Sequence, residues 1–326
     1  MTDPEWLLLV SLSDPESSGP AASDLARVRV GAIMHAISAH GAEPVAFRKL
    51  LPLKGQAGAA LDTWLEEAET RQMWANAYAM QLGFERERVS VAMTAAGVEH
   101  VAVKGPVFAA EIYDQPSDRP FTDIDMLVGL ESFGAMAPVM QSLGFALAHR
   151  SDRDRSGRYL EQKWQCGQPL RLIEVHGDLV HYPGLRKHLK FGLAEYRISS
   201  GDGQFPMAAH FMTAIVHASC GHKFHDLHFI TDILQAFRKL GSADLAHLAT
   251  VSGKLRAGPE IRAGLSLLAQ IYRPKGIDAA LDLFKVGGFA AFPVSASSIR
   301  NAPARTWPSR IAHNAFRIRQ HIVSRS

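Results

Sequence analysis

Two aspartates separated by one residue are the feature of this sequence best suited to chemistry. Asp123 and Asp125 lie in the apolar run Phe121–Val128, which is bounded by Pro120 and Gly129 and predicts a mostly buried strand. Side chains alternate along a strand, so both carboxylates are expected on one face. Neighbouring carboxylates repel unless a cation lies between them, and hard oxygen ligands suit Mg2+ or Mn2+. We therefore predict a divalent-metal site; the alternative is a solvated strand end.

Positively charged residues and a glycine flank the aspartates. Lys104 and Gly105 follow the short apolar strand predicted at Val101–Val103 and precede a predicted helix at Val107–Tyr113. Glycine lets backbone amides approach a phosphate, and the start of a helix favours an anion. Lys104 and Arg119 add positive charge. The pattern therefore predicts that Lys104, Gly105 and Arg119 bind phosphate.

A third carboxylate lies in another apolar strand, predicted at Pro169–Val175. Glu174 and His176 share a face of this strand. An acid in such a strand is costly unless it is paired with a charge or bound to a metal. If this strand lies beside that of the aspartates, Glu174 becomes the third carboxylate of the site. The alternative is a salt bridge from Glu174 to Arg171 or Lys163.

The elements that position these residues predict an α+β fold. The chain of 326 residues with 47% hydrophobic content can bury a sizeable core, in one large domain or two smaller ones. We expect an N-terminal helical segment (1–95), a core with a small mixed sheet (96–205) and a C-terminal helical region with a basic tail (206–326). Residues 59–95 predict two helices broken near Gly83, with the aromatic residues Trp64, Trp74 and Tyr78 in the core.

A cluster of histidines characterises the predicted helices between Pro206 and Leu240. Its members are His210, His217, His222, His225 and His228, around Cys220 and Asp226. One interpretation is a zinc site, because Cys and His are the usual zinc ligands, although the spacing matches no standard signature. The other is that the histidines line the cleft or cap helices. Asp232, in the same segment, is expected to buttress the cleft.

Composition and charge restrict the function classes and the compartment. The formal charge of +3 is too small to argue for nucleic-acid binding by itself. The two cysteines, Cys166 and Cys220, fit a reducing compartment. The apolar run Trp6–Leu12 lacks a basic segment before it, so we expect no secretory signal, and no apolar run is long enough to span a bilayer. The expected location is the cytoplasm.

The C-terminal segment is basic. After Asp282 no acidic residue occurs, whereas the chain carries Lys285, Arg300, Arg305, Arg310, Arg317, Arg319 and Arg325. Residues 311–323 predict a short helix with one apolar stripe. This tail is expected either to dock on an acidic partner, RNA or an anionic membrane surface, or simply to be solvated or packed on the core.

The ordered set of motifs resembles the nucleotidyltransferase superfamily with the DNA polymerase beta-like fold, and more closely its uncharacterised bacterial branch. The resemblance covers roughly Leu82 to Leu240. It rests on Lys104-Gly105 after an apolar strand, Ile112-Tyr113, Arg119, Asp123-Ile124-Asp125-Met126-Leu127-Val128, Gly144-Phe145, Glu174-Val175-His176, His217-Ala218 and Thr231-Asp232-Ile233. The chain differs from the superfamily in having Pro106 after Gly105, where an amide donor is lost, and a glutamate as the third acid.

The resemblance implies a metal-dependent transfer of a nucleoside monophosphate from an NTP, such as ATP, with release of pyrophosphate. Asp123 and Asp125 would hold Mg2+ or Mn2+ on the triphosphate, Glu174 would help to hold a second ion, and His176 would orient a ligand. The acceptor stays open: a small molecule, peptide, protein or RNA. Alternatives are an inactive nucleotide-binding or antitoxin-like module, favoured by Pro106, and a tailoring enzyme in a biosynthetic cluster that transfers another phosphate-activated group, such as a sugar.

Overall fold

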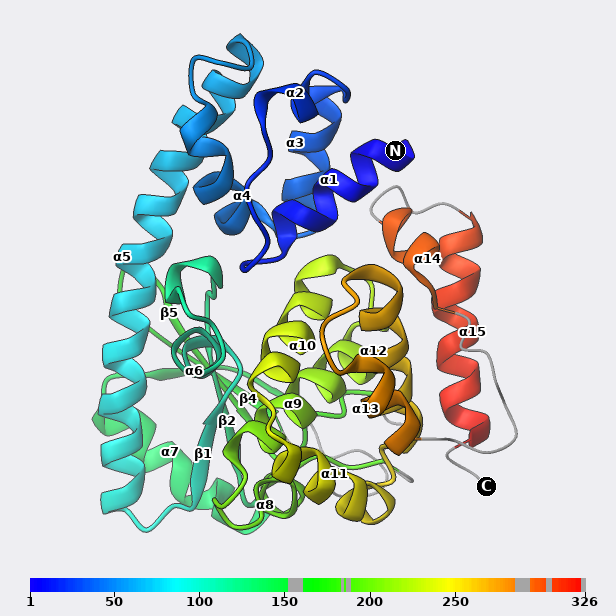
Figure 1. Cartoon of the computed structure of the whole chain (residues 1–326). Helices are drawn as coiled ribbons and strands as arrows, with labels where there is room; N and C mark the ends of the chain where they lie inside the picture. Colours follow the sequence, from blue (N-terminus) through cyan, green and yellow to red (C-terminus); the bar gives the residue numbers. More distant parts are fainter. Residues whose placement is uncertain (152–160, 183–184, 186–188, 285–293, 303–306, 324–326) are drawn as a thin grey trace.

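The computed structural model describes residues 1–151, 161–182, 185, 189–284, 294–302 and 307–323 (Figure 1). A five-stranded sheet has the order β1-β2-β5-β4-β3. Its strands are β1 (His100–Val103), β2 (Ile124–Val128), β3 (Ala146–Ser151), β4 (Glu161–Cys166) and β5 (Arg171–His176). The pair β2/β5 is parallel and the other pairs are antiparallel, so the sheet is mixed. The predicted α+β class is confirmed.

The strand that carries the aspartates is shorter than predicted. It begins at Ile124, so Asp123 precedes the strand instead of lying within it. The reason is that β1 ends at Val103, the partner of Asp125, and the backbone then turns at Lys104. Residues before Ile124 therefore have no β1 partner to extend the ladder.

The N-terminal helices precede the sheet. They are α1 (Asp3–Ser13), α2 (Ala22–Leu25), α3 (Val30–Ala39), α4 (Glu43–Leu50), the 3-10 turn η1 (Leu51–Leu53) and the long α5 (Ala59–Ala95). The predicted break near Gly83 is wrong, because α5 is continuous. A glycine inside a helix costs only about 1 kcal/mol, and burial of Leu82 and Val89 against the sheet offsets that cost. The core position predicted for Trp74 is also wrong, since its side chain is 68% exposed.

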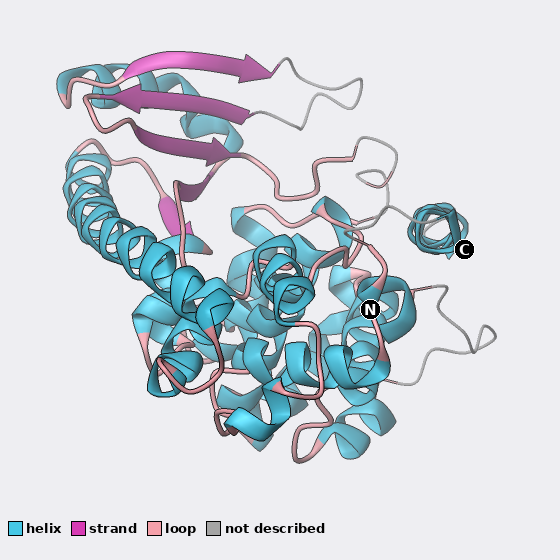
Figure 2. Cartoon of the chain, turned by 90° about the horizontal axis from the view of Figure 1, so that it is seen from above, coloured by secondary structure: helices cyan, strands magenta, loops and turns pink. Residues whose placement is uncertain are grey.

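Helices also connect and follow the strands. Between β1 and β3 lie α6 (Gly105–Glu111), η2 (Pro116–Asp118), η3 (Leu130–Ser132) and α7 (Phe133–Ser142). After β5 come α8 (Leu193–Ser200), α9 (Pro206–Val216), the π-helical turn η4 (His217–Gly221), α10 (Leu227–Lys239), α11 (Ser242–Leu255), α12 (Gly258–Ile271), α13 (Ile277–Leu283), α14 (Ala296–Arg300) and α15 (Trp307–Val323). Figure 2 shows the strands gathered at one side of this helical body.

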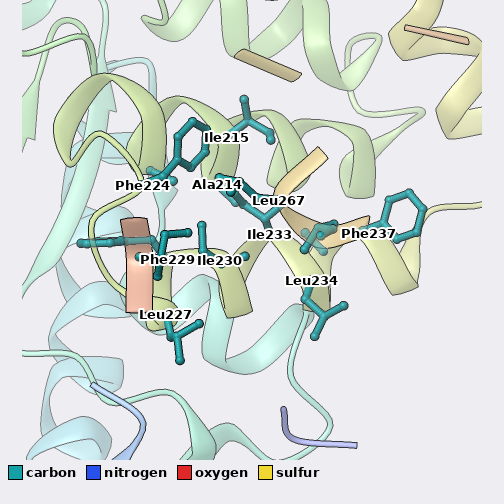
Figure 3. Close-up of a cluster of buried hydrophobic side chains, with 14 of the residues drawn as sticks. Ala214, Ile215, Phe224, Leu227, Phe229, Ile230, Ile233, Leu234, Phe237 and Leu267 are labelled. Atoms are coloured by element: carbon teal, nitrogen blue, oxygen red, sulfur yellow. The ribbon is translucent and has the colours of Figure 1, made fainter. Parts of the chain in front are cut away.

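Two hydrophobic clusters hold the fold together. One joins the N-terminal helices to the C-terminal helices, and Figure 3 shows its centre, with Ile215, Ile233 and Leu267 close to one another. Gly264 of α12 allows this close packing, because a Cβ there would lie 2.3 Å from Cδ1 of Ile215. The other cluster fills the space between the sheet, α5 and α7. The helices at both ends of the chain therefore share one core.

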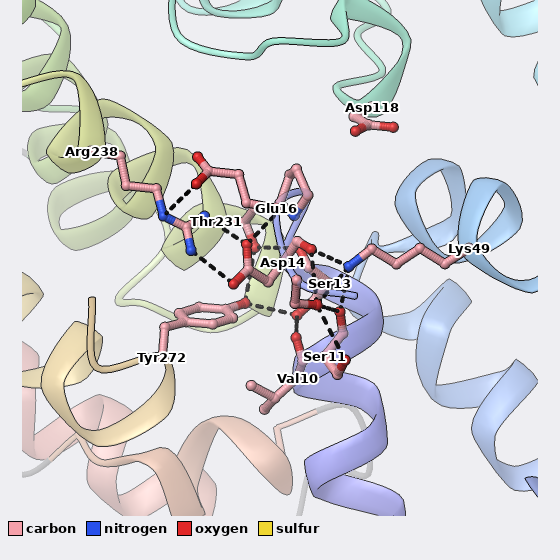
Figure 4. A network of polar contacts seen from close by, with 12 residues as sticks. Val10, Ser11, Ser13, Asp14, Glu16, Lys49, Asp118, Thr231, Arg238 and Tyr272 are labelled. Carbon is pink, nitrogen blue, oxygen red and sulfur yellow. Dashed lines mark hydrogen bonds and ion pairs between the residues drawn. The ribbon is translucent and has the colours of Figure 1, made fainter. Parts of the chain in front are cut away.

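A polar network ties the end of α1 to α4 and α10 (Figure 4). The Arg238 guanidinium donates to both oxygens of Asp14, at 2.6 and 2.9 Å. The Lys49 ammonium donates to the carbonyl of Ser11 at 2.8 Å and to the hydroxyl of Ser17 at 2.6 Å. Burial lowers the pKa of Lys49 to about 8. The network fixes the loop after α1 against the C-terminal helices.

The basic tail is partly a packed helix. Phe316 of α15 is buried, with its ring 5.3 Å from that of Phe224, and Arg317 donates to the carbonyl of Cys220 at 2.7 Å. This matches the core-packed alternative for α15, whereas Lys285, Arg305 and Arg325 lie outside the described residues. None of the helices in the described part of the chain has the length and apolar character that crossing a bilayer requires.

Candidate active site

Three carboxylates meet at a cleft beside the sheet. The parallel pairing of β2 with β5 places Asp125 directly beside Glu174. The condition under which Glu174 becomes the third carboxylate, that its strand lies beside that of the aspartates, is therefore met. Asp123, just before β2, lines the same cleft, which has a volume of about 590 Å³. The structure thus brings the predicted carboxylates to one place.

The cleft is strongly polar and is formed by the sheet, the loop before β2 and the start of the C-terminal helices. Its lining residues are Lys104, Gly105, Arg119, Pro120, Phe121, Thr122, Asp123, Asp125, Glu161, Lys163, Glu174, His181, His217, Gly221, His222 and His228. Six of the seven predicted site residues are among them. The seventh, His176, is fully buried beneath the cleft.

Basic groups contact the two paired carboxylates. Nζ of Lys104 lies 2.6 Å from Oδ1 of Asp125, and Nε2 of His176 lies 2.8 Å from the same oxygen. Lys163 of β4 contacts Glu174 in a short ion pair. The salt bridge that the sequence offered as an alternative role for Glu174 is therefore present, and it lies inside the cleft.

The aspartates differ in electrostatic environment. Burial, together with the charges of Asp125 and Glu174, raises the pKa of Asp123 to about 6, against the opposing effect of Lys104. Burial also disfavours ionisation of Asp125, but the charge of Lys104 and the contact with His176 outweigh burial and lower its pKa. Asp125 is thus satisfied by its neighbours, whereas Asp123 is short of positive charge.

The chemistry of these residues fits a hard divalent cation. Among the described residues, Asp125, Glu174 and His176 offer ligand atoms that all lie within 4.8 Å of one another. Asp123 adds a carboxylate from the same cleft, and its pKa is raised by burial and by the neighbouring charge of Asp125. Oxygen-rich sets of this kind suit Mg2+ or Mn2+. Carboxylates of Asp123, Asp125 and Glu174 are accordingly the candidate ligands.

The chain between β1 and α6 is strained at Lys104. Its backbone has φ 54° and ψ −144°, a conformation that residues other than glycine rarely adopt. Gly105 follows at φ 26°, where a Cβ would lie 3.0 Å from the carbonyl oxygen of Asp123. This turn carries the Lys104 ammonium to Asp125 and brings the two loops into contact. Strain of this type is often found at functional sites.

The predicted phosphate site at the start of α6 is only partly supported. The helix has seven residues, and Pro106 within its first turn has no amide hydrogen to donate. Gly105, Pro106 and Val107 are all buried. Binding of phosphate by Lys104, Gly105 and Arg119 stays a prediction. In it, the positive charges of the Lys104 and Arg119 side chains supply most of the attraction for the phosphate.

Arg119 is held by a partner from the C-terminal helices. Its Nε and Nη2 each lie 3.0 Å from an oxygen of Asp232, and its guanidinium lies 5.2 Å from the centre of the Phe108 ring. Tyr113 donates to Asp232 at 2.8 Å. The expected role of Asp232 as a buttress of the cleft agrees with this contact. Arg119 is only 12% exposed, yet it lines the cleft.

Three histidines of the predicted cluster form one wall of the cleft. His217, His222 and His228 surround the ring of Phe229, with centroid distances of 5.2, 4.0 and 3.8 Å. Burial lowers the pKa of each of these histidines, to about 4 for His222. In the part of the chain that is described, no His or Cys of this segment belongs to a group able to hold a metal. The cleft-lining interpretation fits the structure, and the zinc interpretation has no support.

Glu161 and His181 also line the cleft and were not identified from the sequence. Glu161 lies on the same face of β4 as Lys163, whose Nζ is 3.2 Å from its carboxylate. Alternation along that strand is the signal that identifies it. His181 follows β5 in an irregular segment, where no periodicity points to a face of the sheet.

The chain matches a described protein family. The profile of a family described as "uncharacterised nucleotidyltransferase" matches residues 27–273, which include the whole sheet and every residue that lines the cleft. No curated protein and no solved structure matches the chain.

Proposed function

Because this chain belongs to the uncharacterised nucleotidyltransferase family, we propose that it transfers a nucleoside monophosphate from an NTP to an acceptor and releases pyrophosphate. The observation that carries this proposal is the pairing of Asp125 with Glu174 across β2 and β5, beside Asp123 and Lys104 in one cleft. Carboxylates that converge in this way suit the binding of divalent ions and, through them, of a triphosphate.

Asp123, Asp125 and Glu174 would hold Mg2+ or Mn2+. When bound, the ion would polarise the phosphoryl oxygens and offset the charge that develops on them. Lys104 and Arg119 offer positive charge to the triphosphate from the same cleft. His176, which contacts Asp125 from beneath, would fix the orientation of that carboxylate, and Lys163 would fix that of Glu174.

The reaction is a displacement at the α-phosphorus of the NTP. An acceptor oxygen forms the new bond to phosphorus, and the bond to the oxygen that bridges the α- and β-phosphorus breaks. Pyrophosphate takes the electron pair of the broken bond, and the proton of the acceptor hydroxyl passes to water or to a base in the cleft. Cations near the leaving oxygens lower the barrier because they stabilise the departing charge.

The test is pyrophosphate release from labelled NTPs with Mg2+ or Mn2+ and candidate acceptors. The double variant Asp123→Ala, Asp125→Ala is expected to abolish release. The matched control is Glu66→Ala, Glu67→Ala, which removes two carboxylates that are 66% and 64% exposed on α5 and should release pyrophosphate at the wild-type rate. If the wild type releases pyrophosphate no faster than the aspartate double variant, the enzymatic proposal is refuted.

A second candidate is a nucleotide-binding module that has lost turnover. Pro106 favours it, since the first turn of α6 lacks an amide donor for phosphate. This candidate predicts that NTP and metal bind at the cleft, as measured by calorimetry, while no acceptor yields pyrophosphate. If the missing donor is the cause, replacing Pro106 with Gly or Ser, which restore the donor, should make pyrophosphate release detectable.

A further inference from the structure

A second cavity adjoins the cleft. It has a volume of about 180 Å³ and shares Arg119, Pro120 and His228 with the cleft lining. The remaining walls come from the N-terminal helices and their connections, through Ala42 and Val45 among others, from Tyr113 and Asp118 between α6 and β2, and from α10. We call it the side cavity. The cleft and the side cavity therefore lie next to each other, with Arg119, Pro120 and His228 between them.

We infer that the side cavity receives the nucleobase of the NTP whose triphosphate lies in the cleft. This inference rests on the proposed function and deepens it. The shared residues give the geometric argument, because a nucleotide has a charged end and a flat ring that must occupy different but connected spaces. The cleft supplies the charged groups, and the side cavity supplies an enclosed space.

The size of the side cavity suits one flat ring system. A protein cavity of about 150 Å³ takes up benzene, so about 180 Å³ admits a base and excludes a complete nucleotide. The ribose and phosphates would then have to stay in the cleft. The volume thus predicts which part of the NTP enters.

The walls of the side cavity are largely apolar. Ala42, Val45 and Tyr113 are 4%, 3% and 6% exposed, and they line the side cavity together with Pro120. Transfer of a flat, weakly polar ring from water to such walls is favourable. Polar residues of the lining are already paired, Asp118 with Arg48, Asp232 with Arg119 and Thr231 with Tyr272. A phosphate or a sugar would therefore lose its hydration there without enough partners in return.

His228 supplies a specific hydrogen-bond acceptor. Its Nδ1 lies 3.3 Å from the carbonyl oxygen of His40, which can only accept, so Nδ1 carries the hydrogen. Burial lowers the pKa of His228 and so favours the neutral imidazole, in which Nε2 is an acceptor without a partner among the described residues. Gly41 permits this arrangement, since a Cβ there would lie 2.8 Å from Nδ1 of His228. An acceptor at this position suits the exocyclic amino group of adenine, cytosine or guanine, which uracil lacks.

The experiment compares the binding of a whole nucleotide with that of its phosphate part. The probes are the ATP analogue with a methylene group between the α- and β-phosphorus, which blocks transfer, and tripolyphosphate, each with Mg2+ in calorimetry. Ala42→Leu, just before α4, and Val45→Phe, within it, fill the side cavity and are expected to raise the Kd of the analogue about tenfold or more while the Kd of tripolyphosphate stays constant. His228→Phe is expected to remove a preference for the ATP analogue over the UTP analogue.

The control is Ala46→Leu. Ala46 is fully buried in the same helix but does not line the side cavity, so this variant strains α4 and should leave both Kd values unchanged. If the filling variants bind the ATP analogue as tightly as the wild type, the base lies elsewhere and the inference is overturned. A wild type that binds neither probe would refute the proposed function, whereas unchanged binding in the filled variants refutes only the base compartment.

Discussion

The guanidinium of Arg119 binds both carboxylate oxygens of Asp232 at 3.0 Å each, although 113 residues separate the two in the chain. The contact joins the loop before β2, which carries Asp123, to α10 of the C-terminal helices. Both side chains are nearly buried, at 12% and 4% exposure. The edge of the cleft is therefore fixed by a desolvated, bidentate ion pair.

Removal of one partner of this pair is expected to be costly. Asp232→Ala leaves the Arg119 charge and the Tyr113 hydroxyl without their acceptor, and should lower the free energy of unfolding by about 3 to 5 kcal/mol in guanidinium denaturation. The control, Asp114→Ala, breaks an exposed contact with Lys239 and should cost about 1 kcal/mol or less. Equal losses in the two variants would contradict the structural role of the buried pair.

Two variants at Lys104 allow the role of its side chain in activity to be measured separately from the effect of its backbone conformation on stability. Lys104→Gly and Lys104→Ala both remove the ammonium beside Asp125, so both are expected to lose pyrophosphate release. Glycine accepts φ 54° without strain, and its variant should be more stable than the alanine variant by about 1 kcal/mol in thermal or urea unfolding. At Lys163, in the regular strand β4, the order should reverse, because glycine weakens a strand interior. If Lys104→Ala is as stable as Lys104→Gly, the backbone at position 104 carries no strain.

Sequence patterns within single strands predicted the central carboxylates of the site, Asp125 and Glu174. The apolar surroundings of Asp125 and Glu174 indicated that both belong to one site if their strands are neighbours, and the register of β2 and β5 meets this condition. The position of Asp123 outside β2 was not predictable in this way, since it depends on where the neighbouring strand β1 ends. The alternation of side chains shows which residues share a face of a strand, but it does not show at which residue the strand begins.

Contacts between distant segments were beyond the sequence patterns. Nothing in the spacing of Arg119 and Asp232 indicates that they form a bidentate pair, although each was singled out separately. Gly83 was expected to break a helix because local propensity was considered without the burial of Leu82 and Val89 on the sheet, which favours a continuous α5. Tertiary packing decided both outcomes.

The two roles offered for Glu174 can be separated by one pair of variants. Its contact with Lys163 is partly solvated, with side-chain exposures of 13% and 35%, so Glu174→Gln should change the free energy of unfolding by about 1 kcal/mol or less. A role in metal binding predicts a loss of pyrophosphate release of about 100-fold or more. Lys163→Met breaks the same ion pair but keeps the carboxylate, and should retain more release than Glu174→Gln. Equal activity of the two variants would assign Glu174 to the salt bridge alone.

His40 is expected to make stability depend on pH. It is fully buried between the N-terminal helices and α10, where Nδ1 accepts from the amide of Leu227 at 3.4 Å, and burial lowers its pKa to about 4 from a usual 6.5. Between these pH values the unfolded chain binds a proton that the folded chain does not, so stability falls as the pH falls from 6.5 to 4. The loss from this group is at most about 3 kcal/mol. His40→Asn keeps an acceptor for Leu227 but cannot titrate, so its free energy of unfolding should fall less steeply in urea denaturation at pH 7, 5.5 and 4. Other buried histidines contribute equally to both proteins, and parallel curves would therefore show that His40 is not the titrating group.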